Sequence, residues 1–174
     1  MLYELGLLKM KLKFTYMKFL FLLLSCTIFA QNPIDSLLLQ HNKKTIPYVT
    51  INEFKKIKNP IVLDTREQKE FGVSHLKNAT CVGYIQFNLQ KVKENYRDLS
   101  DTIIVYCSVG IRSEIIGTKL KKAGYKNVFN LYGGIFGWKN NNEEVFDNNQ
   151  NLTQKVHGFS KDWSKYLQKG TKTY

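Results

Sequence analysis

The stretch 102–113, TIIVYCSVGIRS, decides the fold. Its first five residues are a β-branched and aromatic run, the strongest strand signal in the chain. Apolar residues then recur at helical spacing from Ile115 to Ala123, and Gly124 suits a left-handed helix cap. The stretch therefore predicts a buried strand that passes through a short loop into a helix, with Cys107 directly after the strand.

Strands and helices alternate on both sides of this stretch. Buried strands are predicted at 61–63, leading to Asp64, and at 128–131, with a weaker strand at 81–82. Helices are predicted at 51–57, where Thr50 and Glu53 have the spacing of a capping box, at 87–99, and from Gly133-Gly134 through Trp138. This alternation predicts an α/β fold, a doubly wound, mainly parallel sheet flanked by helices on both faces. Ligands of such sheets bind beyond the carboxyl ends of the strands, which directs attention to Cys107.

The amino-terminal segment has the pattern of an export signal. Lys18 is followed by the apolar run 19–29, which is too short to span a bilayer, and then by Ala30. We interpret Met17 as the start, residues 1–30 as an upstream segment plus signal peptide, and the mature protein as periplasmic or extracellular. An alternative is processing at Cys26, which would leave a lipid-anchored protein.

The remainder divides into three parts. Residues 31–47 are an amphipathic lead-in and residues 48–145 form the α/β domain. Residues 146–174 are predicted to be a loop and a helical extension, because apolar residues between Val156 and Leu167 have roughly helical spacing.

Charge and cysteine usage limit the partners. Without residues 1–30 the chain keeps 22 basic and 13 acidic residues, a surplus that suits small anions. The lysines are scattered and no nucleic-acid-binding motif is present, so nucleic acid is not expected as a partner. Cys81 and Cys107 remain after export, and we interpret Cys81 as a small buried hydrophobic residue, although pairing with Cys107 stays open.

The loop 107–113 has the residue types of an anion cradle. A thiol at a helix amino terminus faces unpaired N–H groups and the positive end of the helix dipole, which lower its pKa. Gly110 lets successive amides point inward, and Arg112 adds a permanent cation. The candidate site is therefore Cys107 as nucleophile, with an anion-binding loop of Ser108, Val109, Gly110, Ile111, Arg112 and Ser113.

Four separated pieces resemble the rhodanese family over residues 48–145. They are Leu63-Asp64-Thr65-Arg66-Glu67 with Glu70-Phe71 after it, His75-Leu76-Lys77-Asn78-Ala79, Cys107 to Ser113, and Tyr132-Gly133-Gly134-Ile135-Phe136-Gly137-Trp138. Lys77-Asn78 stands where the family has Pro-Gly. The resemblance implies a sulfurtransferase in which the Cys107 thiolate takes sulfur from thiosulfate or a similar donor, holds it as a persulfide, and passes it to cyanide or a thiol.

The resemblance also assigns supporting roles. Arg112 would order the loop or meet the donor, Arg66 would be a second anion contact, and Asp64 and Glu67 would brace the loop. His75 is expected to make buried structural hydrogen bonds, since a thiolate needs no general base. No cofactor or metal is implied.

Three alternatives remain open. A phosphatase or arsenate reductase of this fold has one more residue between cysteine and arginine than the four found here, 108–111. A non-catalytic binding module usually lacks the cysteine. A persulfide carrier would use the same Cys107 but deliver the sulfur to a protein partner.

Overall fold

Strand β4 (Thr102–Tyr106) lies at the centre of a five-stranded sheet in the computed structural model, which describes Lys13 and residues 33–174. The strand order is β1-β5-β4-β2-β3, and every pairing is parallel. The partners are β1 (Tyr48–Val49), β2 (Ile61–Asp64), β3 (Thr80–Cys81) and β5 (Asn127–Leu131). The predictions of a parallel sheet and of strands at 61–63, 102–106 and 128–131 are thus confirmed.

Helices cover both faces of this sheet, as predicted. They are α2 (Pro33–His41), α3 (Ile51–Phe54), α4 (Gln68–Val73), α5 (Leu89–Asn95), α6 (Ile111–Lys122) and α7 (Gly134–Asn140). The capping box of Thr50 and Glu53 is present, and Gly124 has the expected positive φ of 106°. Helix α5 is shorter than the predicted 87–99, and Leu99 is partly exposed.

The alternation of side chains along β4 produces two cores. Ile103 and Val105 pack with Ile116 and Leu120 of α6 on one face. Ile104 and Tyr106 pack with residues of α7, including Phe136, on the other. Because successive side chains of a strand point to opposite faces, one apolar strand supplies both cores.

The carboxyl-terminal segment differs from the predicted loop and helix. It contains β6 (Val145–Phe146), β7 (Leu152–Thr153), β8 (Lys155–His157), a short helix α8 (Lys161–Ser164) and β9 (Thr171–Thr173). Strands β6 and β7 pair antiparallel, while β8 and β9 pair in parallel. Gly158, Phe159 and Gly170 interrupt any helix, since Phe159 and Gly170 have φ of 64° and 89° and the amide of Gly158 bonds to Thr173. The prediction of a helical extension was therefore wrong for most of its length.

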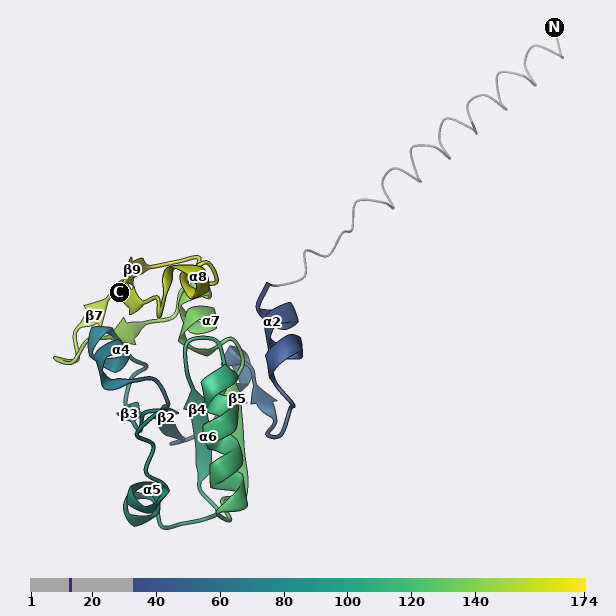
Figure 1. Ribbon diagram of the computed structural model, residues 1–174, viewed down its shortest axis with the longest axis vertical. Helices are drawn as coiled ribbons and strands as arrows, with labels where there is room; N and C mark the ends of the chain where they lie inside the picture. The colour runs from purple at the N-terminus through teal and green to yellow at the C-terminus, as the bar shows by residue number, and fades with distance from the viewer. Residues whose placement is uncertain (1–12, 14–32) are drawn as a thin grey trace, which may run out of the picture. The chain divides into compact units, whose positions relative to one another are not determined.

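Figure 1 shows α7 and α8 at the end of the sheet where β4 passes into α6. The carboxyl-terminal segment thus lies at the edge where a parallel sheet places its ligands. The predictions of a signal peptide, of a start at Met17 and of lipidation at Cys26 lie outside the described residues. Within those residues, no helix is long and apolar enough to cross a membrane.

Candidate active site

Cys107 directly follows β4 and precedes α6, at the position that the sequence predicts. The residue is buried, with 1% of its surface exposed. Gly110 caps α6 in a left-handed conformation, with φ of 116°, which a residue with a side chain rarely adopts. This turn directs the Gly110 amide at the thiol, with 3.1 Å between the nitrogen and Cys107 Sγ.

The electrostatics of this position favour the thiolate. Burial alone would raise the pKa of Cys107, but the charge of Arg112 and the backbone amides of Ser113 and Gly110 outweigh burial and lower it. A thiolate is the reactive form of cysteine in attack on sulfur. The loop is thus arranged to hold an anionic, nucleophilic sulfur.

Two neighbouring elements fix the shape of the loop. The amides of Ile135 and Phe136, in the first turn of α7, donate to the carbonyls of Cys107 and Ser108 at 2.9 and 3.0 Å. The side chain of Asn130 donates to the Gly110 carbonyl at 2.8 Å and accepts the hydroxyl of Ser113 at 2.7 Å. The loop carbonyls therefore point away from the thiol and its amides remain available to it.

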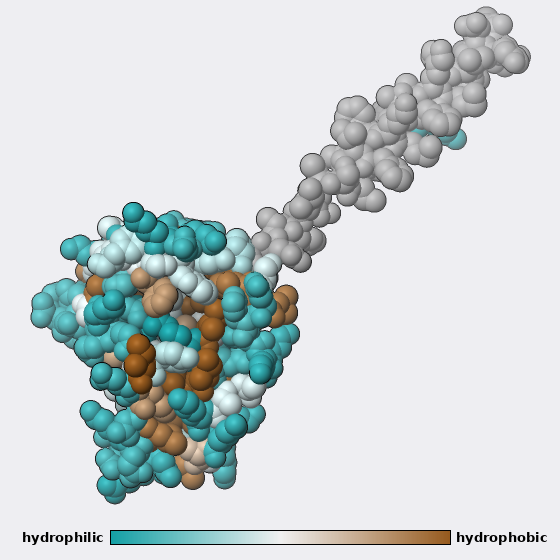
Figure 2. Space-filling model, in the orientation of Figure 1, coloured by the Kyte–Doolittle hydropathy of each residue, from teal (hydrophilic) through white to brown (hydrophobic). Residues whose placement is uncertain are grey.

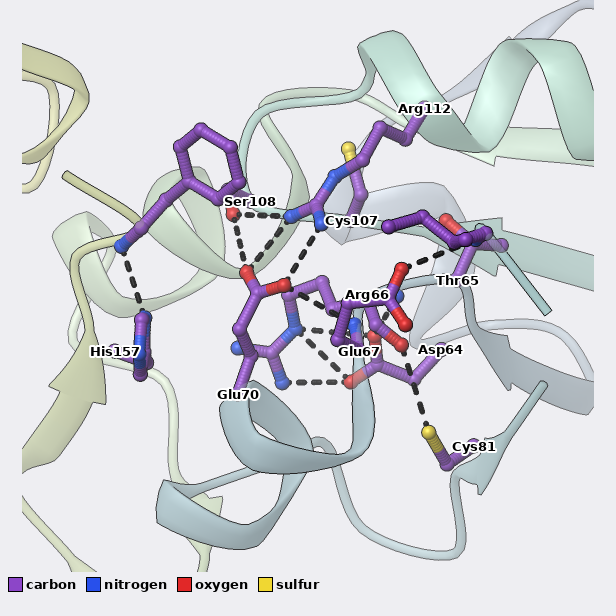
Figure 3. A network of polar contacts seen from close by, with 12 residues as sticks. Asp64, Thr65, Arg66, Glu67, Glu70, Cys81, Cys107, Ser108, Arg112 and His157 are labelled. Atoms are coloured by element: carbon purple, nitrogen blue, oxygen red, sulfur yellow. Dashed lines mark hydrogen bonds and ion pairs between the residues drawn. The ribbon is translucent and has the colours of Figure 1, made fainter. Parts of the chain in front are cut away.

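Arg112 is held by a buried carboxylate that the sequence analysis did not assign to the site. Its two terminal nitrogens donate to the two oxygens of Glu70 at 2.7 and 2.8 Å, and one of them also donates to Ser108 Oγ at 3.1 Å. Burial would raise the pKa of Glu70, but the bonds from Arg112 lower it, so the pair is ionised. Figure 3 shows Arg112 between the Cys107 loop and Glu70. Through Ser108, Arg112 links the Cys107 loop to Glu70, and the predicted role of Arg112 in ordering the loop stays a prediction.

Arg66 has a different role from the predicted anion contact. It is fully buried and donates to both oxygens of Asp64 and to the Ser74 carbonyl. The Arg66–Asp64 pair therefore braces the end of β2 from within the protein and does not face a ligand. Glu67 caps α4 and accepts the amide of Ile85 at 3.1 Å, which also makes it a structural residue.

The remaining loop and motif residues have the following positions. Val109 is buried in the core on the α7 face, and Ile111 is the first residue of α6. His75 is buried, stacks on Phe71, and its Nδ1 lies 2.9 Å from the Leu76 carbonyl, in agreement with a structural role.

Cys81 lies apart from the cradle. It is a free, half-buried thiol at the end of β3, and it donates to the Arg66 carbonyl at 3.5 Å. Burial raises its pKa to about 11, which leaves it protonated near neutral pH. Figure 3 places the two sulfurs at opposite ends of the polar network, and Cys107 is also a free thiol. Cys81 is more exposed than the predicted buried residue.

A small cavity opens onto Cys107. It measures about 100 Å³ and is lined by Cys107, Ser108, Val109, Ile111, Arg112, Phe159 and Trp163. A larger cavity of about 450 Å³, between α2 and α6, does not include the cysteine. The contribution of Phe159 and Trp163 was not predicted, because only the tertiary fold brings residues 159 and 163 to the loop. No group of three or more potential metal ligands exists among the residues that the structure describes.

Comparisons with known proteins identify the family to which this sequence and fold are similar. The family model of the rhodanese-like domain matches residues 50–141. The thiosulfate sulfurtransferase GlpE of Haemophilus influenzae is 38% identical over 81 residues, which cover 45% of this chain and 71% of that protein. A tRNA uridine(34) hydroxylase of Prochlorococcus marinus is 39% identical over 93 residues, which cover 48% of this chain and 29% of the hydroxylase.

Solved structures share the fold. A thiosulfate sulfurtransferase of Pseudomonas aeruginosa aligns with a TM-score of 0.55 and 23% identity, covering 74% of this chain and 25% of that one. A rhodanese-like domain from Anabaena aligns with a TM-score of 0.52 and 20% identity, covering 59% and 80%. This chain therefore spans about a quarter of the Pseudomonas protein and less than a third of the hydroxylase.

Proposed function

This chain belongs to the family of rhodanese-like domains, and on that premise we propose that it transfers sulfane sulfur from thiosulfate or a similar donor to a thiophilic acceptor. The observation that supports this proposal most strongly is the Gly110 amide 3.1 Å from Cys107 Sγ, together with the lowered pKa of that thiol. A thiolate in an amide cradle is what attack on a sulfur donor requires.

The reaction has two steps. In the first, the Cys107 thiolate attacks the outer sulfur of thiosulfate, a new S–S bond forms, the S–S bond of the donor breaks, and sulfite leaves with the electron pair. The negative charge then rests on the outer sulfur of a Cys107 persulfide. The amides of Gly110 and Ser113, which lower the pKa of Cys107, are the groups available to stabilise this charge.

In the second step an acceptor such as cyanide attacks the outer sulfur. The carbon–sulfur bond forms, the S–S bond of the persulfide breaks, and its electron pair returns to Cys107 as thiolate. Thiocyanate leaves, and the enzyme is ready for another donor. Neither step transfers a proton to or from Cys107, so the site needs no general base beside the thiol.

The alternatives differ in what the cradle must hold. Four residues separate Cys107 from Arg112, and Arg112 is already bonded to Glu70 and Ser108, which favours a sulfur species over a phosphate bound by a free arginine. The hydroxylase relatives share only this domain, because less than a third of their length is covered. Our proposal therefore concerns the activity of the domain itself.

The test is turnover of purified protein with thiosulfate and cyanide. We expect thiocyanate from the parent and none from Cys107→Ser, while Cys81→Ser should keep the activity because Cys81 lies outside the cradle. Thiocyanate production by Cys107→Ser equal to that of the parent would refute the assignment. Phosphate release from an aryl phosphate without thiocyanate would favour a phosphatase.

We also propose that the protein acts outside the cytoplasm, on the basis of the apolar run 19–29 and Ala30. Mass spectrometry of the mature protein should give Gln31 as the first residue. A lipid-modified Cys26 would instead support membrane anchoring, and an intact amino terminus would contradict export.

A further inference from the structure

The carboxyl-terminal segment places two aromatic side chains at the mouth of the Cys107 cavity. Phe159 and Trp163 line this cavity, although both lie beyond residue 141, where the match to the family model ends. Phe159 is 48% exposed, so its ring faces both the cavity and the solvent. In Figure 2 the exterior of the carboxyl-terminal segment is mainly polar, whereas apolar residues gather below it on the same face.

The backbone holds Phe159 in a conformation that an aromatic residue rarely adopts. Its φ is 64°, in the left-handed region, which is costly for a bulky side chain and persists only when the surroundings fix it. The Phe159 amide donates to His157 Nδ1 at 3.0 Å, and the neighbouring Gly158 amide donates to the Thr173 carbonyl at 2.8 Å. Strand β9 thus ties the segment in place on one side of Phe159.

The helix on the other side fixes Trp163. Ser160 caps α8 by accepting the Trp163 amide at 3.4 Å, and the Phe159 and Trp163 rings meet edge to face with centroids 6.3 Å apart. The two rings therefore form one aromatic surface.

This surface lies on the charged group beside the nucleophile. The guanidinium carbon of Arg112 is 4.9 Å from the centroid of the Phe159 ring, within the range of a cation–π interaction. Arg112 cannot easily move away, because Glu70 binds it through two hydrogen bonds. The ring is thus fixed to the same residue that links the Cys107 loop to Glu70.

We propose that Phe159 and Trp163 form an aromatic lid that admits small sulfur acceptors to Cys107 and excludes cysteines of folded proteins. The proposal rests on the sulfurtransferase activity proposed above and names the class of acceptor. An acceptor sulfur must come within about 2 Å of the persulfide sulfur to form a bond. With Cys107 1% exposed behind a cavity of about 100 Å³, a small ion or thiol fits, whereas a protein cysteine brings its own backbone to the mouth.

The lid can be tested without sulfur transfer, by alkylation of Cys107 in the full chain. The background carries Cys26→Ser and Cys81→Ser, so that Cys107 is the one thiol of the sequence that remains. The two reagents are iodoacetamide, which is small, and a fluorescein-linked maleimide, which is bulky. Phe159→Gly removes the ring and suits the positive φ, so that the fold is preserved. Phe159→Tyr keeps the ring, and Leu152→Ala alters an exposed residue of the same segment that does not line the cavity.

We expect Phe159→Gly to raise the rate with the maleimide about tenfold or more and the rate with iodoacetamide much less, because only the bulky reagent needs the lid removed. Phe159→Tyr and Leu152→Ala should behave like the parent. An unchanged maleimide rate in Phe159→Gly would overturn the proposal, and so would an equal acceleration of both reagents, which would indicate general loosening of the loop.

Turnover then tests the acceptor class. Phe159→Gly should raise the ratio of sulfur transfer to a small folded protein with one exposed cysteine over transfer to cyanide. If thiocyanate is still produced but the ratio of protein acceptor to cyanide is unchanged, the lid is refuted and the sulfurtransferase proposal is not. If no variant produces thiocyanate, the sulfurtransferase proposal is refuted, and the alkylation rates alone decide on the lid.

Discussion

Arg112 and Glu70 meet through two parallel hydrogen bonds of 2.7 and 2.8 Å, although 42 positions separate them in the sequence. Glu70 comes from α4 after β2 and Arg112 from the first turn of α6 after β4, so the pair joins the carboxyl ends of two adjacent strands. The carboxylate fixes the cation beside Cys107 and balances its charge. The reactivity of the thiol therefore depends on a residue that does not touch it.

Removal of the Arg112 charge should raise the pKa of Cys107. Arg112 favours the thiolate, so in Arg112→Gln the thiol should keep its proton to higher pH. We expect the parent's alkylation rate to rise with a midpoint below the ordinary cysteine value, and the midpoint of Arg112→Gln to lie at a higher pH than that of the parent. The measurement is the pH profile of the iodoacetamide rate in a background of Cys26→Ser and Cys81→Ser.

The double variant Arg112→Gln, Glu70→Gln provides the control for this profile. It removes both charges. In Arg112→Gln alone, the unpaired Glu70 carboxylate would repel the Cys107 thiolate and raise its pKa further, and the double variant eliminates this contribution. Its midpoint should lie between those of the parent and Arg112→Gln. Identical midpoints in the parent and both variants would show that Arg112 has no electrostatic effect on the thiol.

Asp64→Asn should destabilise the fold strongly. Both partners of the Arg66–Asp64 pair are fully buried, and loss of the carboxylate would leave an uncompensated guanidinium inside the protein. Breaking such a pair costs about 3–5 kcal/mol of unfolding free energy. Urea unfolding followed by circular dichroism measures this loss.

The matched control is the exposed ion pair of Lys55 and Glu143, which has 54% and 22% of its side chains accessible. Glu143→Gln should cost less than about 1 kcal/mol, because water screens such a pair. Equal losses for the two substitutions would mean that Asp64 is not the buried brace described above.

Gly134→Ala should distort the Cys107 loop. A Cβ at Gly134 would collide with the Cys107 carbonyl oxygen and lie 2.7 Å from that of Ser108, and φ of Gly134 is 55°. The backbone strain alone is worth about 1–3 kcal/mol. We expect lower unfolding free energy and slower alkylation of Cys107.

Gly72→Ala is the corresponding control. Its Cβ would meet only the flexible side chain of Asn148, at 3.2 Å, and its φ is not positive. The variant should match the parent in stability to within about 1 kcal/mol and in alkylation rate. A Gly134→Ala variant as stable and reactive as Gly72→Ala would contradict the close packing of α7 on the loop.

Much of this architecture follows from local sequence. The runs at 61–63 and 102–106 indicate strands because they are rich in β-branched residues, and the structure buries each of them except for its first residue. The position of Cys107 then follows from the end of β4, and the turn that presents it follows from Gly110.

Other features depend on contacts that no local pattern encodes. Sequence alone does not distinguish a buried strand-end arginine from one that faces a ligand, and Arg66 proved to be buried on Asp64. Glu70 has no special neighbours along the chain that mark it as the partner of Arg112. The aromatic spacing at 156–167 resembles a helix, but the left-handed turn at Phe159 and the pairing of β8 with β9 produce a different structure.

The central claim is that Cys107 carries the transferred sulfur. The most direct measurement is mass spectrometry of the purified protein after exposure to thiosulfate and digestion under non-reducing conditions. We predict that the peptide containing Cys107 gains the mass of one sulfur atom, that the peptide containing Cys81 does not, and that cyanide removes the added mass. An unmodified Cys107 peptide, or added sulfur on Cys81 alone, would contradict the account.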